Sequence, residues 1–223
     1  MSGEDRHSEA LGQEIITDPE QRARQEIRNG ARQFDFAVEL IESSLQPEKP
    51  FRLKPSTILS LNRLALEGIE GLAGVYRPVD IEISESRHKP PAPYLVPELV
   101  EELCDYVNAH WDRSPIHLAS YVMWRLNWIH PFVDGNGRTT RITSFVVLCV
   151  RLGYRVPGTK TIPEQIARNK KPYYEALEQA DLAYGKDKRI DVSTMESLLG
   201  TLLANQLAGV IHDAKSDQAR PIA

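Results

Sequence analysis

Two apolar helical segments that follow each other closely constrain the fold most strongly. The first, residues 114–129, opens with Ser114 and Pro115, which are typical of an N-cap and of the first helical position. The second, residues 138–152, ends before Gly153 and contains the most apolar run of the chain. That run falls well short of the ~18 residues that a membrane span requires. Both segments are therefore predicted to be buried helices at the centre of a globular domain.

The rest of the chain predicts an all-α protein of about eight helices around this central pair, with one small β-hairpin. Asp18 and Pro19 predict a helix start, and a hairpin strand is expected at 79–83, where apolar and acidic residues alternate. The expected organisation is a flexible tail over 1–20, an N-terminal helix and connector over 21–55, the main domain over 56–212 and a second tail over 213–223. Apolar residues spaced by three and four predict further helices at 22–44, 56–68, 96–111, 162–184 and 192–212.

Composition narrows the class of protein. Hydrophobic residues make up 41% and charged residues 26% of the chain, as in ordinary globular proteins. A formal net charge of -4 argues against a broad nucleic-acid-binding surface. Cys104 and Cys149 lie in apolar segments without metal-ligand spacing, so both are expected to be buried, reduced thiols. The N-terminal residues lack the apolar run of a secretory signal, so we expect a cytoplasmic protein that binds neither membrane nor nucleic acid.

The turn between the two central helices carries an unusual set of side chains, and residues 129–141 read IHPFVDGNGRTTR. A helix N-terminus exposes N–H donors and a partial positive charge, and Gly135 and Gly137 allow the turn to curl these donors around an anion. Arg138 and Arg141 lie one helical turn apart, so both guanidinium groups can grip phosphate oxygens. The sequence therefore predicts a site for a ligand with more than one phosphate.

Three further side chains of the turn extend this prediction. Asp134 would repel a phosphate unless a divalent cation such as Mg2+ lay between them. His130 has a neutral fraction near pH 7 and can accept a proton from an attacking hydroxyl, while Asn136 can donate its amide to a phosphate oxygen. Each residue also has a plainer interpretation, as a helix cap, a common turn residue or a solvated charge. Together they exceed what a turn requires.

The segment HPFVDGNGRTTR resembles the signature of the Fic-domain family, His-Pro-Phe-x-Asp/Glu-Gly-Asn-Gly/Lys-Arg with a second arginine three residues later. Residues 61–78, LNRLALEGIEGLAGVYRP, are similar to the helix that leads into the family's flap, and IEISESRHKPPAP is similar to the flap itself. The resemblance covers roughly residues 56–185. It implies a Fic-type helical bundle that transfers AMP from ATP to a Ser, Thr or Tyr hydroxyl of a target protein, with release of pyrophosphate.

The resemblance also implies a role for each motif residue. His130 would be the general base, and Asp134 would be the Mg2+ ligand. Asn136 would contact the α-phosphate, and the backbone of Gly135 and Gly137 would form the anion hole. Arg138 and Arg141 would contact the β- and γ-phosphates.

Two regions outside the motif would complete the site. The target would dock as an extra strand at the flap, at Val79, Ile81 and Ile83, with His88 or Lys89 positioning its hydroxyl. A solvated loop charge is the favoured explanation for both His88 and Lys89. The nucleoside pocket would be built from Tyr173, Tyr174 and Leu177, although core packing explains at least two of them equally well.

Many members of the family are inhibited by a helix with the pattern Ser/Thr-x-x-x-Glu-Gly/Asn. Here the only Ser or Thr with a glutamate four residues later is Ser44, and the prolines flanking Glu48 argue against a helix there. Three explanations stay open: a separate antitoxin-like protein supplies the glutamate, the enzyme is constitutively active, or a nonstandard segment such as the N-terminal helix covers the site. The oligomeric state also stays open.

Other functions compete with transfer of AMP. The segment 153–161 resembles a phosphate-binding P-loop only superficially, because Thr159 separates Gly158 from Lys160 and a helix precedes the segment. A noncatalytic binding module would be expected to lose His130 or Asp134 first. Transfer of UMP, GMP or phosphocholine in place of AMP stays open.

Overall fold

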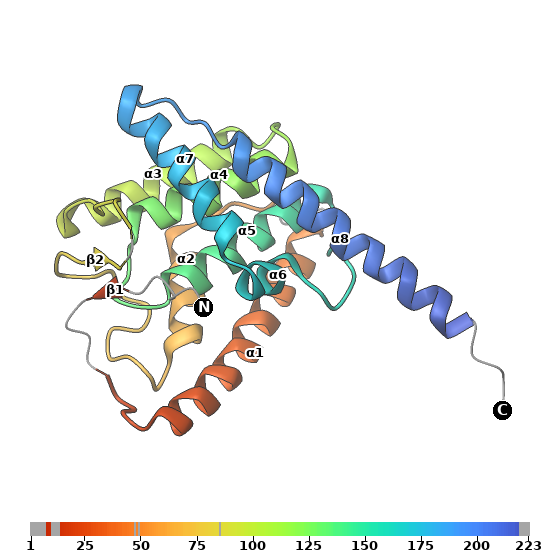
Figure 1. Cartoon of the computed structure of the whole chain (residues 1–223), viewed down its shortest axis with the longest axis horizontal. Coiled ribbons are helices and arrows are strands. Elements are labelled where there is room, and N and C mark those ends of the chain that lie inside the picture. The colour runs from red at the N-terminus through yellow and green to blue at the C-terminus, as the bar shows by residue number, and fades with distance from the viewer. Residues whose placement is uncertain (1–7, 10–13, 47, 49, 85, 219–223) are drawn as a thin grey trace.

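The computed structural model describes residues 8–9, 14–46, 48, 50–84 and 86–218 of the chain. Within these residues the protein is an α-helical bundle, so the predicted fold class is confirmed (Figure 1). The helices are α1 (Pro19–Ser44), α2 (Pro55–Leu66), α3 (Val96–Ala109), α4 (Pro115–Ile129), α5 (Asn136–Leu152), α6 (Ile162–Arg168), α7 (Lys171–Asp187) and α8 (Ser193–Gln218), with a 3-10 turn η1 (Pro93–Leu95).

The predicted central pair, α4 and α5, forms the core of the bundle. Most residues of both helices are buried, and the Ser144 hydroxyl donates across the pair to the Ala119 carbonyl at 2.8 Å. The helices α1, α2 and α6 pack against α5, whereas α3, α7 and α8 pack against α4. The turn between α4 and α5 is therefore held at one end of the core, surrounded by elements from distant parts of the chain.

Most of the helix starts follow from local chemistry. Asp18 caps α1 by accepting from the Gln21 N–H at 2.7 Å, and Ser114 caps α4 by accepting from the His117 N–H at 3.0 Å, both as predicted. The prediction of a single helix over 162–184 is wrong, since α6 and α7 are separate helices. Pro172 cannot donate to an upstream carbonyl, so the chain breaks before it and starts a new helix.

The small sheet differs from the expected hairpin. Strand β2 comprises only Glu82–Ile83, and it pairs antiparallel with β1 (Ser8–Glu9), with Ser8 opposite Ile83. The segment after β2 contains the prolines of KPPAP, which lack N–H donors for a returning strand. The partner strand therefore comes from the N-terminal segment, part of which was expected to be a flexible tail.

Buried side-chain hydrogen bonds fix α1 on α2. The Asn29 amide donates to the Glu67 carbonyl at 2.9 Å, and the Gln33 amide donates to the Leu61 carbonyl at 2.8 Å. Glu67 is the C-cap residue of α2, at the end of the helix where carbonyls lack intrahelical partners, and Leu61 lies about two turns before it. This docking brings the first turns of α1 next to the start of α5.

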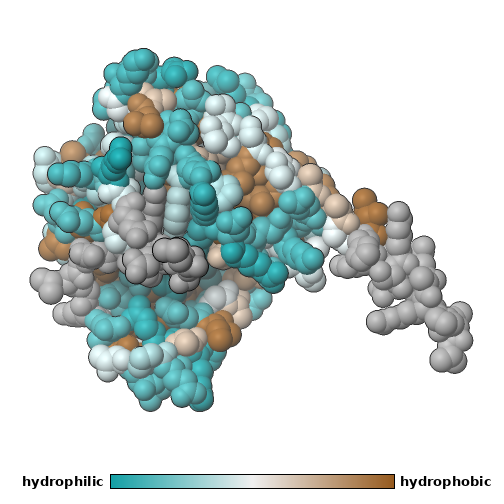
Figure 2. Space-filling view, in the orientation of Figure 1, coloured by the Kyte–Doolittle hydropathy of each residue, from teal (hydrophilic) through white to brown (hydrophobic). Residues whose placement is uncertain are grey.

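Cys104 and Cys149 are buried, unpaired thiols in the bundle, as the sequence predicts. Burial raises the pKa of Cys104 to about 12 and that of Cys149 to about 11. Long α8 projects beyond the body (Figure 1), and the face shown in Figure 2 is mostly hydrophilic, with an apolar patch beside this helix. Among the helices of the described residues, none is both long and apolar enough to cross a bilayer.

Candidate active site

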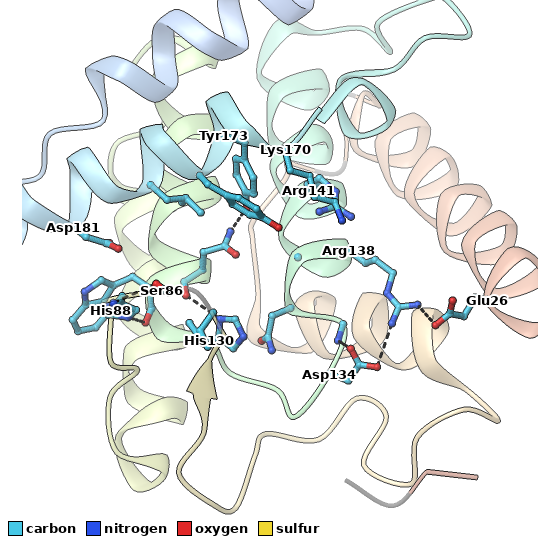
Figure 3. A pocket seen from close by; sticks show the side chains of 18 of the residues that line it. Glu26, Ser86, His88, His130, Asp134, Arg138, Arg141, Lys170, Tyr173 and Asp181 are labelled. Atoms are coloured by element: carbon cyan, nitrogen blue, oxygen red, sulfur yellow. Dashed lines mark hydrogen bonds and ion pairs between the residues drawn. The ribbon is translucent and has the colours of Figure 1, made fainter. Parts of the chain in front are cut away.

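A cavity of about 400 Å³ opens at the turn between α4 and α5, and side chains from α1, α4, α5, α7 and the flap (residues 79–93) line it (Figure 3). Most of the predicted site residues meet here: His130, Asp134, Gly135, Asn136, Gly137, Arg138, Arg141, Tyr173, Tyr174, Leu177, Ile83 and His88. Val79 and Ile81 do not line the cavity. Residues that the sequence interpretation missed also line it: Arg22, Glu26, Ser86, Asn127, Trp128, Lys170 and Asp181.

His130 ends α4 with its backbone in the left-handed region (φ 50°), and its side chain is buried at 8% exposure. Its Nδ1 lies 3.3 Å from the Asn127 carbonyl, so this nitrogen carries the proton and Nε2 carries the lone pair. Burial, together with the nearby positive charge of Arg77, lowers the pKa of His130 to about 3, although the hydrogen bond to the Asn127 carbonyl acts in the opposite direction. The imidazole is therefore neutral at physiological pH.

Arg77 fixes the backbone around His130. Its guanidinium is buried and donates to the carbonyl of His130 at 2.8 Å, to the carbonyl of Val79 at 3.0 Å and to the carbonyl of Pro91. The last two acceptors belong to the flap. One side chain thus connects both arms of the flap to the end of α4. Burial lowers the pKa of this guanidinium.

The turn into α5 is tight. Gly135 is left-handed (φ 75°), and a Cβ there would lie 3.0 Å from Leu66 Cδ1 and 3.1 Å from Asn62 Nδ2. Asn62 is completely buried and donates to the Asp134 carbonyl at 3.1 Å, so α2 holds the turn in place. The first intrahelical bond of α5 runs from the Thr139 N–H to the Gly135 carbonyl, leaving the preceding N–H groups of the first turn without helical acceptors.

Asn136 closes the turn from inside. Its Oδ1 accepts from the Phe132 N–H at 2.9 Å, and its Nδ2 donates to the Phe132 carbonyl at 2.7 Å. One amide hydrogen is therefore used within the turn. The predicted contact of Asn136 with an α-phosphate needs the second hydrogen and stays a prediction.

A chain of ion pairs occupies one end of the cavity, where Figure 3 shows Arg138 between Asp134 and Glu26. Asp134 Oδ2 lies 3.4 Å from Arg138, and Glu26 Oε1 lies 3.4 Å from the other terminal nitrogen of Arg138. Arg22 also reaches both carboxylates, at 3.2 Å from Asp134 and 3.5 Å from Glu26. In the sequence Arg22 and Glu26 look like an ordinary solvated pair on a helix surface, so only the docking of α1 identifies them as site residues.

A glutamate of α1 thus lies against an arginine of the motif. Glu26 does not fit the inhibitory pattern of the family, because Arg22, not Ser or Thr, stands four residues before it and Ile27 follows it.

The opposite end of the cavity is partly aromatic, and Figure 3 places His88, Ser86 and Asp181 there. The His88 Nε2–H donates to the Trp128 carbonyl at 2.7 Å, and the Trp124 indole N–H donates to Asp181 at 2.9 Å. Three other lining residues come from α7, where Tyr173 and Leu177 are buried and Tyr174 is half-buried. The cavity thus combines an end that is rich in ion pairs with an end that is partly aromatic.

Asp134 is the carboxylate best placed to hold a metal at the turn. Within the described ranges, no group of three or more His, Cys, Asp or Glu side chains is arranged to hold a metal ion. A cation at Asp134 would therefore need most of its oxygens from a bound ligand and water. This fits Mg2+, which is commonly held by one or two carboxylates and the phosphates of a substrate.

Comparison with known proteins identifies the domain. The Fic/DOC family model matches residues 52–148. The "Protein adenylyltransferase Fic" of Drosophila willistoni is 31% identical over 151 residues, which make up 66% of this chain and 28% of that protein. The chain therefore spans less than a third of the length of that relative.

Solved structures agree in fold. A Fic domain containing signaling protein from Bacteroides thetaiotaomicron superposes with a TM-score of 0.68 at 23% identity, covering 93% of this chain and 78% of that one. The N-terminal Fic domain of a VirB-translocated effector from Bartonella quintana, solved with bound ADP, gives a TM-score of 0.55 at 17% identity, covering 84% of this chain and 86% of that one. On its motif, its matched residues and its fold, this chain contains a domain of the Fic/DOC family.

Proposed function

We propose that this protein is an adenylyltransferase that moves AMP from ATP to a Ser, Thr or Tyr hydroxyl of a target protein. One observation carries the proposal: neutral His130 faces the same cavity as the N-terminal end of α5 and the arginines that follow it. A proton acceptor beside an anion site is what transfer of a phosphate-linked group to a hydroxyl requires. The adenylyltransferase name of the Drosophila relative and the ADP in the Bartonella domain support the choice of nucleotide.

The residues divide the chemistry between them. The target hydroxyl gives its proton to His130 Nε2 as its oxygen bonds to the α-phosphorus, and the bond from this phosphorus to the β-phosphate oxygen breaks. Main-chain N–H groups of Gly135 to Arg138 stabilise the negative charge on the α-phosphate oxygens. Arg138 and Arg141 hold the pyrophosphate as it leaves, because guanidinium groups bind phosphate oxygens bidentately. Tyr173, Tyr174 and Leu177 pack around the nucleoside.

The proposed metal is Mg2+, and Asp134 is its proposed protein ligand. When bound, it would neutralise phosphate charge and orient the leaving group. Until it binds, the Asp134 carboxylate is compensated by Arg22 and Arg138.

The target protein is proposed to dock along the flap. Ile83, Ser86 and His88 reach the cavity from this segment, so a chain lying beside β2 would bring a hydroxyl toward His130. Val79 and Ile81 would then belong to the docking edge rather than to the cavity. The expected cytoplasmic location stays a prediction.

Glu26 favours one of the three explanations for inhibition. Its carboxylate occupies Arg138, one of the two arginines assigned to the β- and γ-phosphates. We infer that α1 restrains the enzyme in the resting state, without a need for a separate antitoxin-like protein.

A labelling experiment tests the proposed function. The protein is incubated with Mg2+ and ATP labelled on the α-phosphate, or separately on the γ-phosphate, together with a cell lysate. We expect label on protein only from the α-position, and loss of at least about 10²-fold in rate for His130→Ala with ATP binding retained. His110→Ala, which alters a histidine outside the cavity, serves as the control. Transfer of the γ-label, or undiminished transfer by His130→Ala, would contradict the proposal, and binding without transfer would identify a binding module.

A further inference from the structure

Arg22 approaches the phosphate end of the cavity from outside the Fic motif. Its NH2 lies 3.2 Å from Asp134 Oδ2, the oxygen that Arg138 NH2 reaches at 3.4 Å. Two guanidinium groups from different helices thus converge on one anionic oxygen. In this position a carboxylate oxygen is bound as a phosphate oxygen would be.

We propose that Arg22 is a third pyrophosphate-binding arginine, which α1 adds to Arg138 and Arg141. The inference rests on the proposed function, because it assigns Arg22 to the leaving group of the same reaction. If a cation bound the Asp134 carboxylate, the two guanidinium groups that neutralise this carboxylate would become available to the β- and γ-phosphates. Arg22 is then a positioning residue for the nucleotide.

The surroundings of Arg22 hold its guanidinium in this orientation. Glu14 accepts from NH1, and Glu26 lies 3.5 Å from Nε, so carboxylates on the far side leave NH2 directed at Asp134. The side chain is 29% exposed, the same as that of Arg138. A ligand arriving at Arg138 therefore meets an arginine that is already aligned.

Docking of α1 does not explain this arrangement. Asn29 and Gln33 fix the helix through buried hydrogen bonds, and Ala37 and Ile41 pack completely in the core. Partly exposed ion pairs such as that of Arg22 add little to stability by comparison.

Charge at the cavity also favours a ligand that brings phosphate. The lining residues carry four cations, Arg22, Arg138, Arg141 and Lys170, and three carboxylates, Glu26, Asp134 and Asp181. Without Arg22 the cations and carboxylates would balance, and the cavity would have no excess positive charge to offset a polyphosphate.

The test compares binding of three ligands, measured by calorimetry in the presence of Mg2+: ATP, inorganic pyrophosphate and AMP. The variant is Arg22→Gln, and the matched control is Arg24→Gln, which changes an exposed arginine on the same helix that pairs with Glu20. We expect Arg22→Gln to weaken binding of ATP and pyrophosphate about tenfold and to leave AMP binding unchanged. Arg24→Gln should bind all three as the unaltered protein does. Arg22→Lys, which keeps the positive charge but not the planar guanidinium that binds bidentately, should recover part of the lost affinity for ATP and pyrophosphate.

Three outcomes would overturn the inference: equal binding of pyrophosphate by Arg22→Gln and the unaltered protein, tighter binding by the variant, or an equal loss for AMP and ATP. Thermal unfolding of each variant shows whether α1 stays docked. If Arg22→Gln unfolds at the same temperature as the unaltered protein and also binds pyrophosphate equally well, the role of Arg22 is contradicted. If the unaltered protein itself bound neither ATP nor pyrophosphate, the proposed function would fail as well. If the unaltered protein binds ATP and pyrophosphate but Arg22→Gln lacks the expected effect, only the role of Arg22 as a third arginine is wrong, and the proposed function stands.

Discussion

Glu26 and Arg22 are neighbours on one face of α1, yet changes at the two residues should have opposite effects. Glu26 places a carboxylate 3.4 Å from Arg138, where it competes with phosphate oxygens for the guanidinium. Glu26→Gln should therefore tighten ATP binding about fivefold, equivalent to about 1 kcal/mol for a partly exposed pair, and raise the transfer rate. Calorimetry and the labelling assay measure both effects. Glu20→Gln, on an exposed part of the same helix, is the control, and weaker ATP binding by Glu26→Gln would show that Glu26 helps the nucleotide to bind.

The buried imidazole of His130 should make stability depend on pH. Its pKa is about 3 in the folded protein and about 6.5 in the unfolded chain, so between these values the unfolded state binds more protons. The contribution to the free energy of unfolding is fully present above about pH 6.5 and is lost as the pH falls toward 3, by up to about 1.4 kcal/mol per pH unit.

Urea unfolding at a series of pH values tests this. His130→Asn keeps an N–H donor for the Asn127 carbonyl but does not titrate, so its stability should fall less steeply on acidification. Parallel pH profiles for the two proteins would mean that His130 is accessible to protons in the folded state.

At the scale of the elements, two left-handed glycines at opposite ends of α5 provide a matched pair. A Cβ at Gly153 would meet nothing within 4 Å, whereas one at Gly135 would meet Leu66 and Asn62 at 3.0 and 3.1 Å. Gly153→Ala should lower the free energy of unfolding by about 1 kcal/mol through backbone strain and leave ATP binding unchanged. Gly135→Ala should cost more and also weaken ATP binding, because the turn must shift. If Gly135→Ala and Gly153→Ala had equal effects on the free energy of unfolding and on ATP binding, the turn at Gly135 would tolerate movement.

The elements that the sequence predicts well are those determined by local patterns. The central pair α4 and α5, the Asp18 and Ser114 caps and the position of the motif at the entrance of α5 all follow from periodicity and capping residues. The break between α6 and α7 was missed although Pro172 signals it. The partner of β2 lies far away in the chain, so no local pattern could identify it.

At the scale of the whole molecule, the site depends on contacts between distant segments, and these were the contacts that sequence reasoning missed. Arg77 reaches His130, Asn62 reaches the turn, and Arg22 and Glu26 reach Asp134 and Arg138. Each is an unremarkable polar residue within its own helix or loop. Only the docking of α1 on α5 assigns Arg22 and Glu26 to the cavity, and Asn62 and Arg77 hold the turn and His130 from outside it. The residues of the motif, in contrast, carry their chemistry in adjacent positions and could be predicted.

The most direct test is a crystal structure of the protein with Mg2+ and a non-hydrolysable ATP analogue. The account predicts phosphates on the main-chain N–H groups at the start of α5, Mg2+ on Asp134, Arg22 and Arg138 moved from this carboxylate to the phosphates, and His130 Nε2 facing the α-phosphate. A nucleotide bound elsewhere, or phosphates bound away from these N–H groups with His130 turned from them, would contradict it.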